Sequence, residues 1–76
     1  MNKEKSLPYL EVGKSGTVDK ILCESSMRRR FFDIGLIPGT VVVCFGCSPF
    51  GDPKAYLVRG KVIAIRKEDA KKILLI

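Results

Sequence analysis

Apolar residues in this chain recur mostly at the two-residue spacing of β-strands, in short runs separated by glycine and proline. The densest run begins at Thr40 and contains three consecutive valines, and another pair of runs alternates around Arg59-Gly60 in the manner of a β-hairpin. Five runs are predicted to be strands: residues 17–23, 40–45, 54–58, 61–65 and 73–75. The pattern predicts an all-β fold, a small antiparallel barrel with one or two short helices.

One segment has helical spacing. Met27, Phe31 and Ile34 recur at i, i+4 and i+7, which predicts a helix over 27–34 with one apolar side toward the core. Ser25 or Ser26 is the expected N-cap, and Gly35 is the expected left-handed residue after the helix. Pro38-Gly39 predicts a tight turn into the next strand, and the acids followed by lysines in 67–72 predict a second helical turn.

Phe32 lies outside this apolar stripe, between Arg28 and Arg29 on the helical wheel. Two interpretations follow. Either the helix closes one end of the barrel and is buried on two sides, or Phe32 is a partner-facing aromatic flanked by arginines, a composition that interface hot spots favour. Arginines at the start of a helix also oppose its dipole, so an anionic partner group would relieve them.

Phe50 occupies the middle of a loop, residues 48–53, that contains two prolines and a glycine. It is either an anchor folded onto the barrel rim or a contact for a partner. Both faces of the strand before this loop are apolar, which predicts a strand that is either central in the sheet or curled so that each face meets a different part of the core. The predicted partner-binding residues are therefore Arg28, Arg29, Phe32 and Phe50.

The three cysteines, Cys23, Cys44 and Cys47, are an odd number, and the chain has no histidine. Cys44 and Cys47 have a C-x-x-C spacing, but they lie in a strand, where their side chains point to opposite faces unless a bulge at Gly46 turns Cys47 round. The favoured interpretation is three small buried hydrophobes. A weak or intermolecular metal site and redox chemistry are the alternatives.

A net charge of +6 and a pI near 9.5 are enough to attract an acidic protein, nucleic acid or anionic lipid headgroups, and charge alone does not choose among them. The basic residues suit a solvated or protein-facing surface, with a small nucleic-acid-binding barrel as the alternative. Residues 1–76 are expected to form a single domain, and no apolar run reaches the roughly 20 residues of a membrane span. The absence of a signal-peptide pattern predicts the cytoplasm.

Enzymatic activity is not expected from this sequence. Without histidine, the remaining titratable residues form no recognisable acid–base constellation, and Gly13-Lys14-Ser15 lacks the preceding glycine and the long following helix of a phosphate-binding loop. The sequence therefore predicts a binding module with no cofactor.

The residues from Arg30 to Thr40, the Ser48–Pro53 loop, Val58-Arg59-Gly60 and the segment 65–70 together resemble FeoA, the small accessory protein of bacterial ferrous iron transport. The resemblance runs from about Leu10 to Leu75. It implies an SH3-like barrel that performs no chemistry and docks on the cytosolic, GTP-hydrolysing region of the membrane transporter FeoB. Membrane proximity would then come only through that partner. The Cys44 and Cys47 pair does not match the family's pattern.

Overall fold

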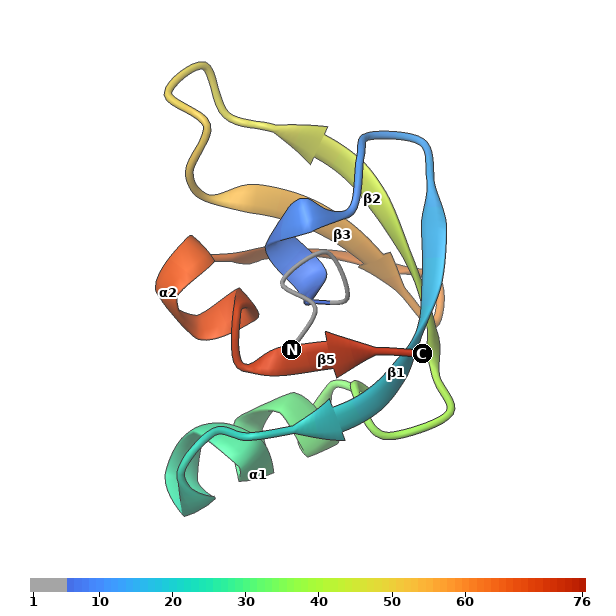
Figure 1. The fold of residues 1–76 in the computed structure, drawn as a ribbon, viewed down its shortest axis with the longest axis vertical. Coiled ribbons are helices and arrows are strands. Elements are labelled where there is room, and N and C mark those ends of the chain that lie inside the picture. The colour runs from blue at the N-terminus through green and yellow to red at the C-terminus, as the bar shows by residue number, and fades with distance from the viewer. Residues whose placement is uncertain (1–5) are drawn as a thin grey trace.

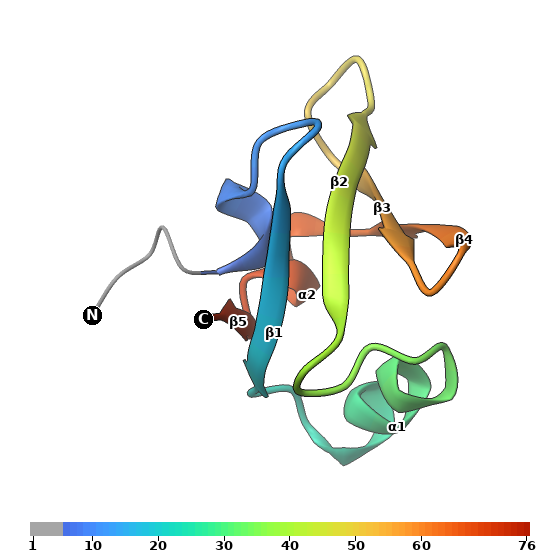
Figure 2. The same ribbon diagram turned by 90° about the vertical axis from the view of Figure 1, so that its right-hand side faces the viewer.

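Residues 6–76 are described by a computed structural model, and they form a five-stranded antiparallel sheet curled around one core (Figures 1 and 2). The strands lie in the order β4-β3-β2-β1-β5. The elements are η2 (Leu7–Tyr9, a 3-10 helix), β1 (Ser15–Ile21), α1 (Ser25–Asp33), β2 (Val41–Cys47), β3 (Lys54–Val58), β4 (Lys61–Ile65), α2 (Lys67–Ala70) and β5 (Ile73–Leu75). The predicted all-β class, with about five strands and two short helices, is confirmed.

The inner face of the sheet and the inner side of α1 supply a single hydrophobic core. Its fully buried side chains include Tyr56, Leu36 and Val18, and the predicted helix residues Met27, Phe31 and Ile34 all pack on it. The chain before β1 also contributes, because Leu7 is fully buried. A domain this small buries only about 60% of the surface of its unfolded chain, so each of these residues carries a large share of the stability.

The N-terminal segment is fastened to β3 by two side chains. Lys54 Nζ donates hydrogen bonds to the backbone oxygens of Pro8 (2.8 Å) and Leu10 (3.1 Å). The Tyr56 hydroxyl donates to the backbone oxygen of Leu7 at 3.4 Å. Lys54 thus provides a donor for the carbonyls of Pro8 and Leu10 at the end of η2. The Leu7 carbonyl already accepts the Leu10 N–H within the turn, and Tyr56 adds a second donor to it.

Helix α1 begins at Ser25, two residues before the predicted start, and its N-cap is Glu24, whose side chain makes no capping hydrogen bond. The prediction of Ser25 or Ser26 as N-cap was wrong. The end of the helix is as expected: Gly35 has a φ of +90°. Its N–H donates to Phe32 O (3.0 Å) while Leu36 N–H donates to Phe31 O (2.8 Å), a Schellman motif.

Strand β2 lies in the middle of the sheet, as predicted, but only one of its faces is covered. Val42 and Cys44 are buried, whereas Val41 and Phe45 on the opposite face are exposed. The expectation of core on both sides of this strand was therefore wrong. The sheet closes around one core, and its convex face has no covering element among residues 6–76.

Burial raises the pKa of the Tyr56 phenol above its usual value of about 10. Above about pH 10 the phenol loses its proton in the unfolded chain but keeps it in the folded chain, so the free energy of unfolding falls as pH rises. Below about pH 10 both states keep the proton, and this group has no effect. We expect a Tyr56→Phe variant to lose less stability than the wild type between about pH 9 and about pH 11. Urea denaturation at both pH values measures this, and identical losses in the two proteins would contradict it.

None of the helices formed by the described residues is long and apolar enough to cross a membrane.

Candidate functional site

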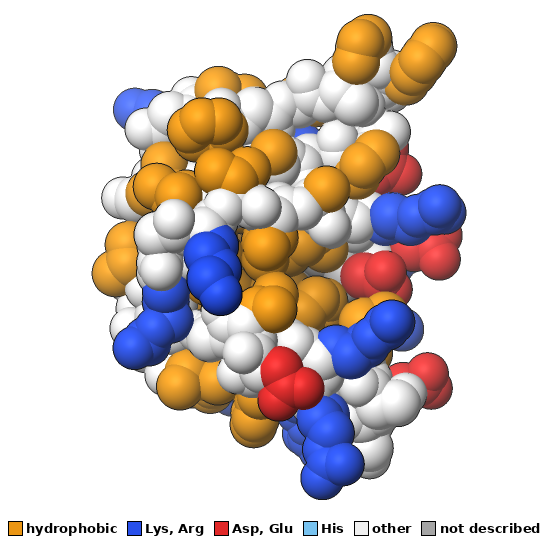
Figure 3. Space-filling view, turned by 180° about the vertical axis from the view of Figure 1, so that it is seen from behind, with side chains coloured by type: hydrophobic (Ala, Val, Ile, Leu, Met, Phe, Trp, Pro, Cys, Tyr) orange, Lys and Arg blue, Asp and Glu red, His pale blue; other side chains and the backbone are white. Residues whose placement is uncertain are grey.

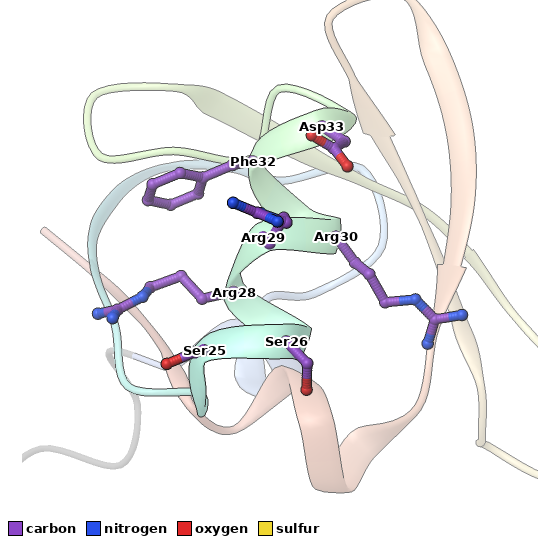
Figure 4. Close-up of a pocket in the computed structure, with 7 residues that line it drawn as sticks. All are labelled: Ser25, Ser26, Arg28, Arg29, Arg30, Phe32 and Asp33. Carbon is purple, nitrogen blue, oxygen red and sulfur yellow. The ribbon is translucent and has the colours of Figure 1, made fainter.

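The outer side of α1 carries three consecutive exposed arginines and one partly exposed aromatic ring (Figure 4). Phe32 is 47% exposed and points to the same side of the helix as Arg28, one turn earlier, while Arg29 projects between them. Arg30 points to the other side, toward the neighbouring strand. The structure thus brings Arg28, Arg29 and Phe32 together, and we call these three residues the α1 surface.

Only Phe31 is fully buried on α1, so the interpretation of a helix buried on two sides was wrong. Because the helix starts at Ser25, Arg28 is its fourth residue and Arg30 lies in its last turn. A helix dipole acts mainly within the first turn, so the expected unfavourable interaction with the dipole is weaker than the sequence indicated. Two arginines, Arg28 and Arg29, lie close together on this surface, and no acid lies in the first turn of the helix, so the α1 surface carries positive charge.

A hollow of about 310 Å³ lies beside Phe32, between α1 and the end of β1. Leu22 and Pro38 give it apolar walls, and Lys20 and Asp19 add one cation and one anion to its lining. Sequence reasoning missed Leu22 because it was placed inside a strand ending at Cys23, whereas β1 ends at Ile21. The burial of both Ile21 and Cys23 leaves Leu22 pointing outward. Successive side chains of an extended chain point to opposite faces, so the burial of its two neighbours was the signal that could have identified Leu22 as exposed.

Phe50 lies far from the α1 surface. The loop between β2 and β3 projects from one end of the molecule and α1 covers the opposite end, in both views (Figures 1 and 2). Phe50 is 94% exposed, so the interpretation of an anchor folded onto the rim was wrong. Phe50 therefore cannot belong to the same compact contact patch as Phe32.

The cysteines are free thiols in three different surroundings. Cys23 and Cys44 are buried as predicted, and burial raises the pKa of the Cys23 thiol, whereas Cys47 is exposed, so its predicted burial was wrong. The register shifts between Cys44 and Gly46, which confirms the bulge and pairs Cys44 with Tyr56 and Cys47 with Lys54. Both cysteines therefore face the same side of the sheet.

Nothing around the cysteines forms a metal site within residues 6–76, where no three Cys, Asp, Glu or His side chains cluster. Cys47 lines a hollow of about 280 Å³ together with Asp52, Lys54 and Tyr56. Lys54 is already engaged by two backbone oxygens, and Asp52 Oδ1 accepts the Lys67 N–H at 2.8 Å. These groups support the N-terminal segment and the base of the 48–53 loop.

Comparison with known families decides the class of protein. The FeoA domain family matches residues 5–76, which is nearly the whole chain. The chain belongs to the FeoA family. The resemblance seen in its glycine and proline positions is thereby confirmed, and the α1 surface is a surface of a FeoA domain.

Solved FeoA structures share this fold. A FeoA-like protein from Clostridium acetobutylicum is 37% identical, with a TM-score of 0.84 over 100% of this chain and 88% of that one. FeoA from Stenotrophomonas maltophilia, solved with zinc and described as a prokaryotic SH3 domain protein, is 23% identical, with a TM-score of 0.82 over 93% of this chain and 88% of that one. The predicted SH3-like architecture is confirmed.

One curated relative joins the domain to a transporter. A protein of Porphyromonas gingivalis, named as a fusion of Fe(2+) transport protein A with the Fe(2+) transporter FeoB, is 27% identical over 67 residues. Those residues make up 88% of this chain and 8% of the fusion protein. The chain therefore corresponds to a small part of that polypeptide.

Proposed function

We propose that this chain is a non-enzymatic, cytoplasmic interaction module of bacterial ferrous iron transport, which binds the cytosolic GTPase region of a FeoB-like transporter. The fusion of the two proteins in a relative carries the proposal. Covalent linkage keeps a domain at high effective concentration beside its partner. A separate chain lacks that linkage and needs a surface with enough affinity of its own.

The α1 surface supplies that affinity. An aromatic ring between arginines is the composition that interface hot spots favour, and Leu22 and Pro38 extend its apolar area. The arginines select an acidic patch on the transporter and accelerate encounter with it. The description of the Stenotrophomonas protein as a candidate activating factor of ferrous iron transport agrees with such a role.

We expect a variant with Arg28, Arg29 and Phe32 all replaced by alanine to bind the cytosolic portion of the transporter at least about tenfold more weakly, because one hot spot alone is worth about 2 kcal/mol. Isothermal titration calorimetry or a quantitative pull-down with the purified portion measures it. The substitutions are on exposed positions, so the fold remains intact.

The matched control replaces Lys14, Lys61 and Val12 by alanine, which removes two exposed cations and one exposed apolar side chain elsewhere. This control should bind as the wild type does. Equal binding by the wild type and the α1 variant would reject the proposed docking surface.

A further inference from the structure

The convex face of β2, β3 and β4 is apolar and contains no charged residue. Its register places Val43 beside Leu57 and Leu57 beside Val62, with Ala55 beside Ala64. The alternate residues of the same strands, including Val42, Tyr56 and Val58, are buried in the core, so this set points outward. We call it the apolar face, and it consists of Val41, Val43, Phe45, Ala55, Leu57, Val62 and Ala64.

The apolar face is open to its surroundings. Val41, Phe45 and Val62 are each more than half exposed, and so is Phe50 of the β2–β3 loop. That loop projects beyond one end of the sheet (Figure 2). Seen from the side on which the β3–β4 hairpin lies, hydrophobic side chains gather over the upper and central surface (Figure 3). Lysines and arginines lie around and between them, and aspartates and glutamates lie along the right-hand and lower edges of the view. Exposed apolar patches of this kind mark interaction sites.

The charge around this face is one-sided. Residues 41–65, which include all three strands, contain Lys54, Arg59 and Lys61 and a single acid, Asp52, and Lys54 is engaged on the inner side of the sheet. Arg59 and Lys61 are exposed at the β3–β4 turn, and exposed Lys14 adjoins the other end, where its carbonyl accepts the Cys44 N–H. The acids at that end are Glu11 and Asp52. The surroundings of the face are therefore positive on balance.

We infer that the apolar face and Phe50 lie directly on an anionic lipid bilayer. Peripheral membrane binding combines an apolar face with nearby cations: burial of apolar surface gives affinity, and each lysine or arginine near anionic headgroups adds roughly fivefold. A protruding aromatic such as Phe50 needs no preformed pocket in a bilayer, whereas a protein partner would have to provide one. The contact is direct and does not depend on the α1 surface.

A second copy of the chain fits the face less well. Two chains of charge +6 repel each other, and face-to-face packing would bring Arg59 and Lys61 of one copy near cations of the other. Nucleic acid also fits poorly, because tracking a phosphate backbone needs cations within the binding groove. Charge complementarity therefore favours the anionic bilayer over both alternatives.

The chain has no tryptophan, so a Phe50→Trp variant carries a single fluorescent probe at the loop tip. With vesicles of phosphatidylglycerol and phosphatidylcholine in equal parts, we expect its emission to shift to the blue, and with phosphatidylcholine alone we expect little shift. A Phe32→Trp variant is the matched control on α1 and should keep its emission. A shift only at position 32, or at neither position, overturns the inference.

Vesicle flotation tests the face itself. We expect Phe45→Ser combined with Phe50→Ser to reduce the fraction bound to anionic vesicles about tenfold, because two exposed aromatics lose their burial. Leu22→Ser, an exposed apolar deletion off the face, should bind like the wild type. Equal flotation of all three proteins would overturn the inference. So would a dimer that forms with rising protein concentration in the absence of vesicles, if the Phe45 and Phe50 variant no longer forms it.

The two assays distinguish failure of this inference from failure of the proposed function. The α1 variant should bind vesicles as the wild type does, and the Phe45 and Phe50 variant should still bind the transporter portion. If the Phe45 and Phe50 variant instead loses transporter binding while vesicle binding is absent, the face belongs to a protein interface.

Discussion

Replacing Phe31 by alanine is expected to lower the free energy of unfolding by about 3–4 kcal/mol, the range for deleting a buried phenylalanine. The side chain is 6% exposed and is the one fully buried residue of α1. Its backbone carbonyl also accepts the N–H of Leu36, which is itself completely buried. The cavity would therefore open where the helix joins the core, and a small domain has little stability in reserve.

Phe32→Ala is the control for this substitution, since it removes the same atoms one residue later on the exposed side of the helix. We expect it to change stability by less than about 0.5 kcal/mol, as surface substitutions usually do. Guanidinium denaturation followed by circular dichroism compares the two variants. Similar destabilisation by both would mean that α1 is packed on two sides, contrary to the structure.

Gly35→Ala has the second large effect, about 3 kcal/mol of destabilisation, from two causes that add. At φ +90° an L-residue is strained, and an added Cβ would overlap Cδ of the Arg59 side chain. Arg59 belongs to the β3–β4 turn, so its side chain has to leave its position against the helix end to admit the methyl group. Thermal or chemical denaturation measures the loss.

Two further variants separate the causes. Gly39 also has a positive φ, +93°, but an added Cβ there meets no atom within 4 Å, so Gly39→Ala should cost only the backbone strain, about 1–2 kcal/mol. Removing the obstructing side chain with Arg59→Ala should make the Gly35→Ala substitution less costly than it is in the wild type. No coupling between the two sites would show that Arg59 moves aside freely.

The elements of the fold were largely predictable because local signals agree with the tertiary structure. The hairpin of β3 and β4 has the predicted bounds, since alternation on both sides of Arg59-Gly60 leaves one register. The helix core side was equally clear from the spacing of Met27, Phe31 and Ile34. Its start was not, because serines suit several positions near a helix N-terminus and none makes the cap here.

What sequence could not provide is which apolar face the fold covers. In β2, apolar residues lie on both faces of the strand, and strand propensity does not distinguish a face that packs on the core from a face that stays exposed. The difference arises only when all five strands curl around one side. Cys47 shows the same limit: the bulge at Gly46 was foreseen, but exposure depends on where the strand ends relative to the core.

The candidate site was partly predictable for the same reason. Arg28, Arg29 and Phe32 share a helix, so their grouping follows from the 3.6-residue period alone. Phe50 was predicted to contact a partner too, but its distance from α1 depends on the direction of β2 between them. Leu22 and Pro38, which lie beside Phe32, come from separate chain segments that only the folded structure brings together.

Helix α1 connects two strands, β1 and β2, that pair with each other directly. The sheet registers on either side of it therefore do not depend on which residues occupy its outward positions. Substitutions there can accumulate during evolution without disturbing the barrel. Under the proposed docking through α1, one scaffold can then be matched to transporters whose surfaces diverge. Exchanging the outward residues of this helix between homologues would then transfer partner preference while the recipient's folding stays unchanged.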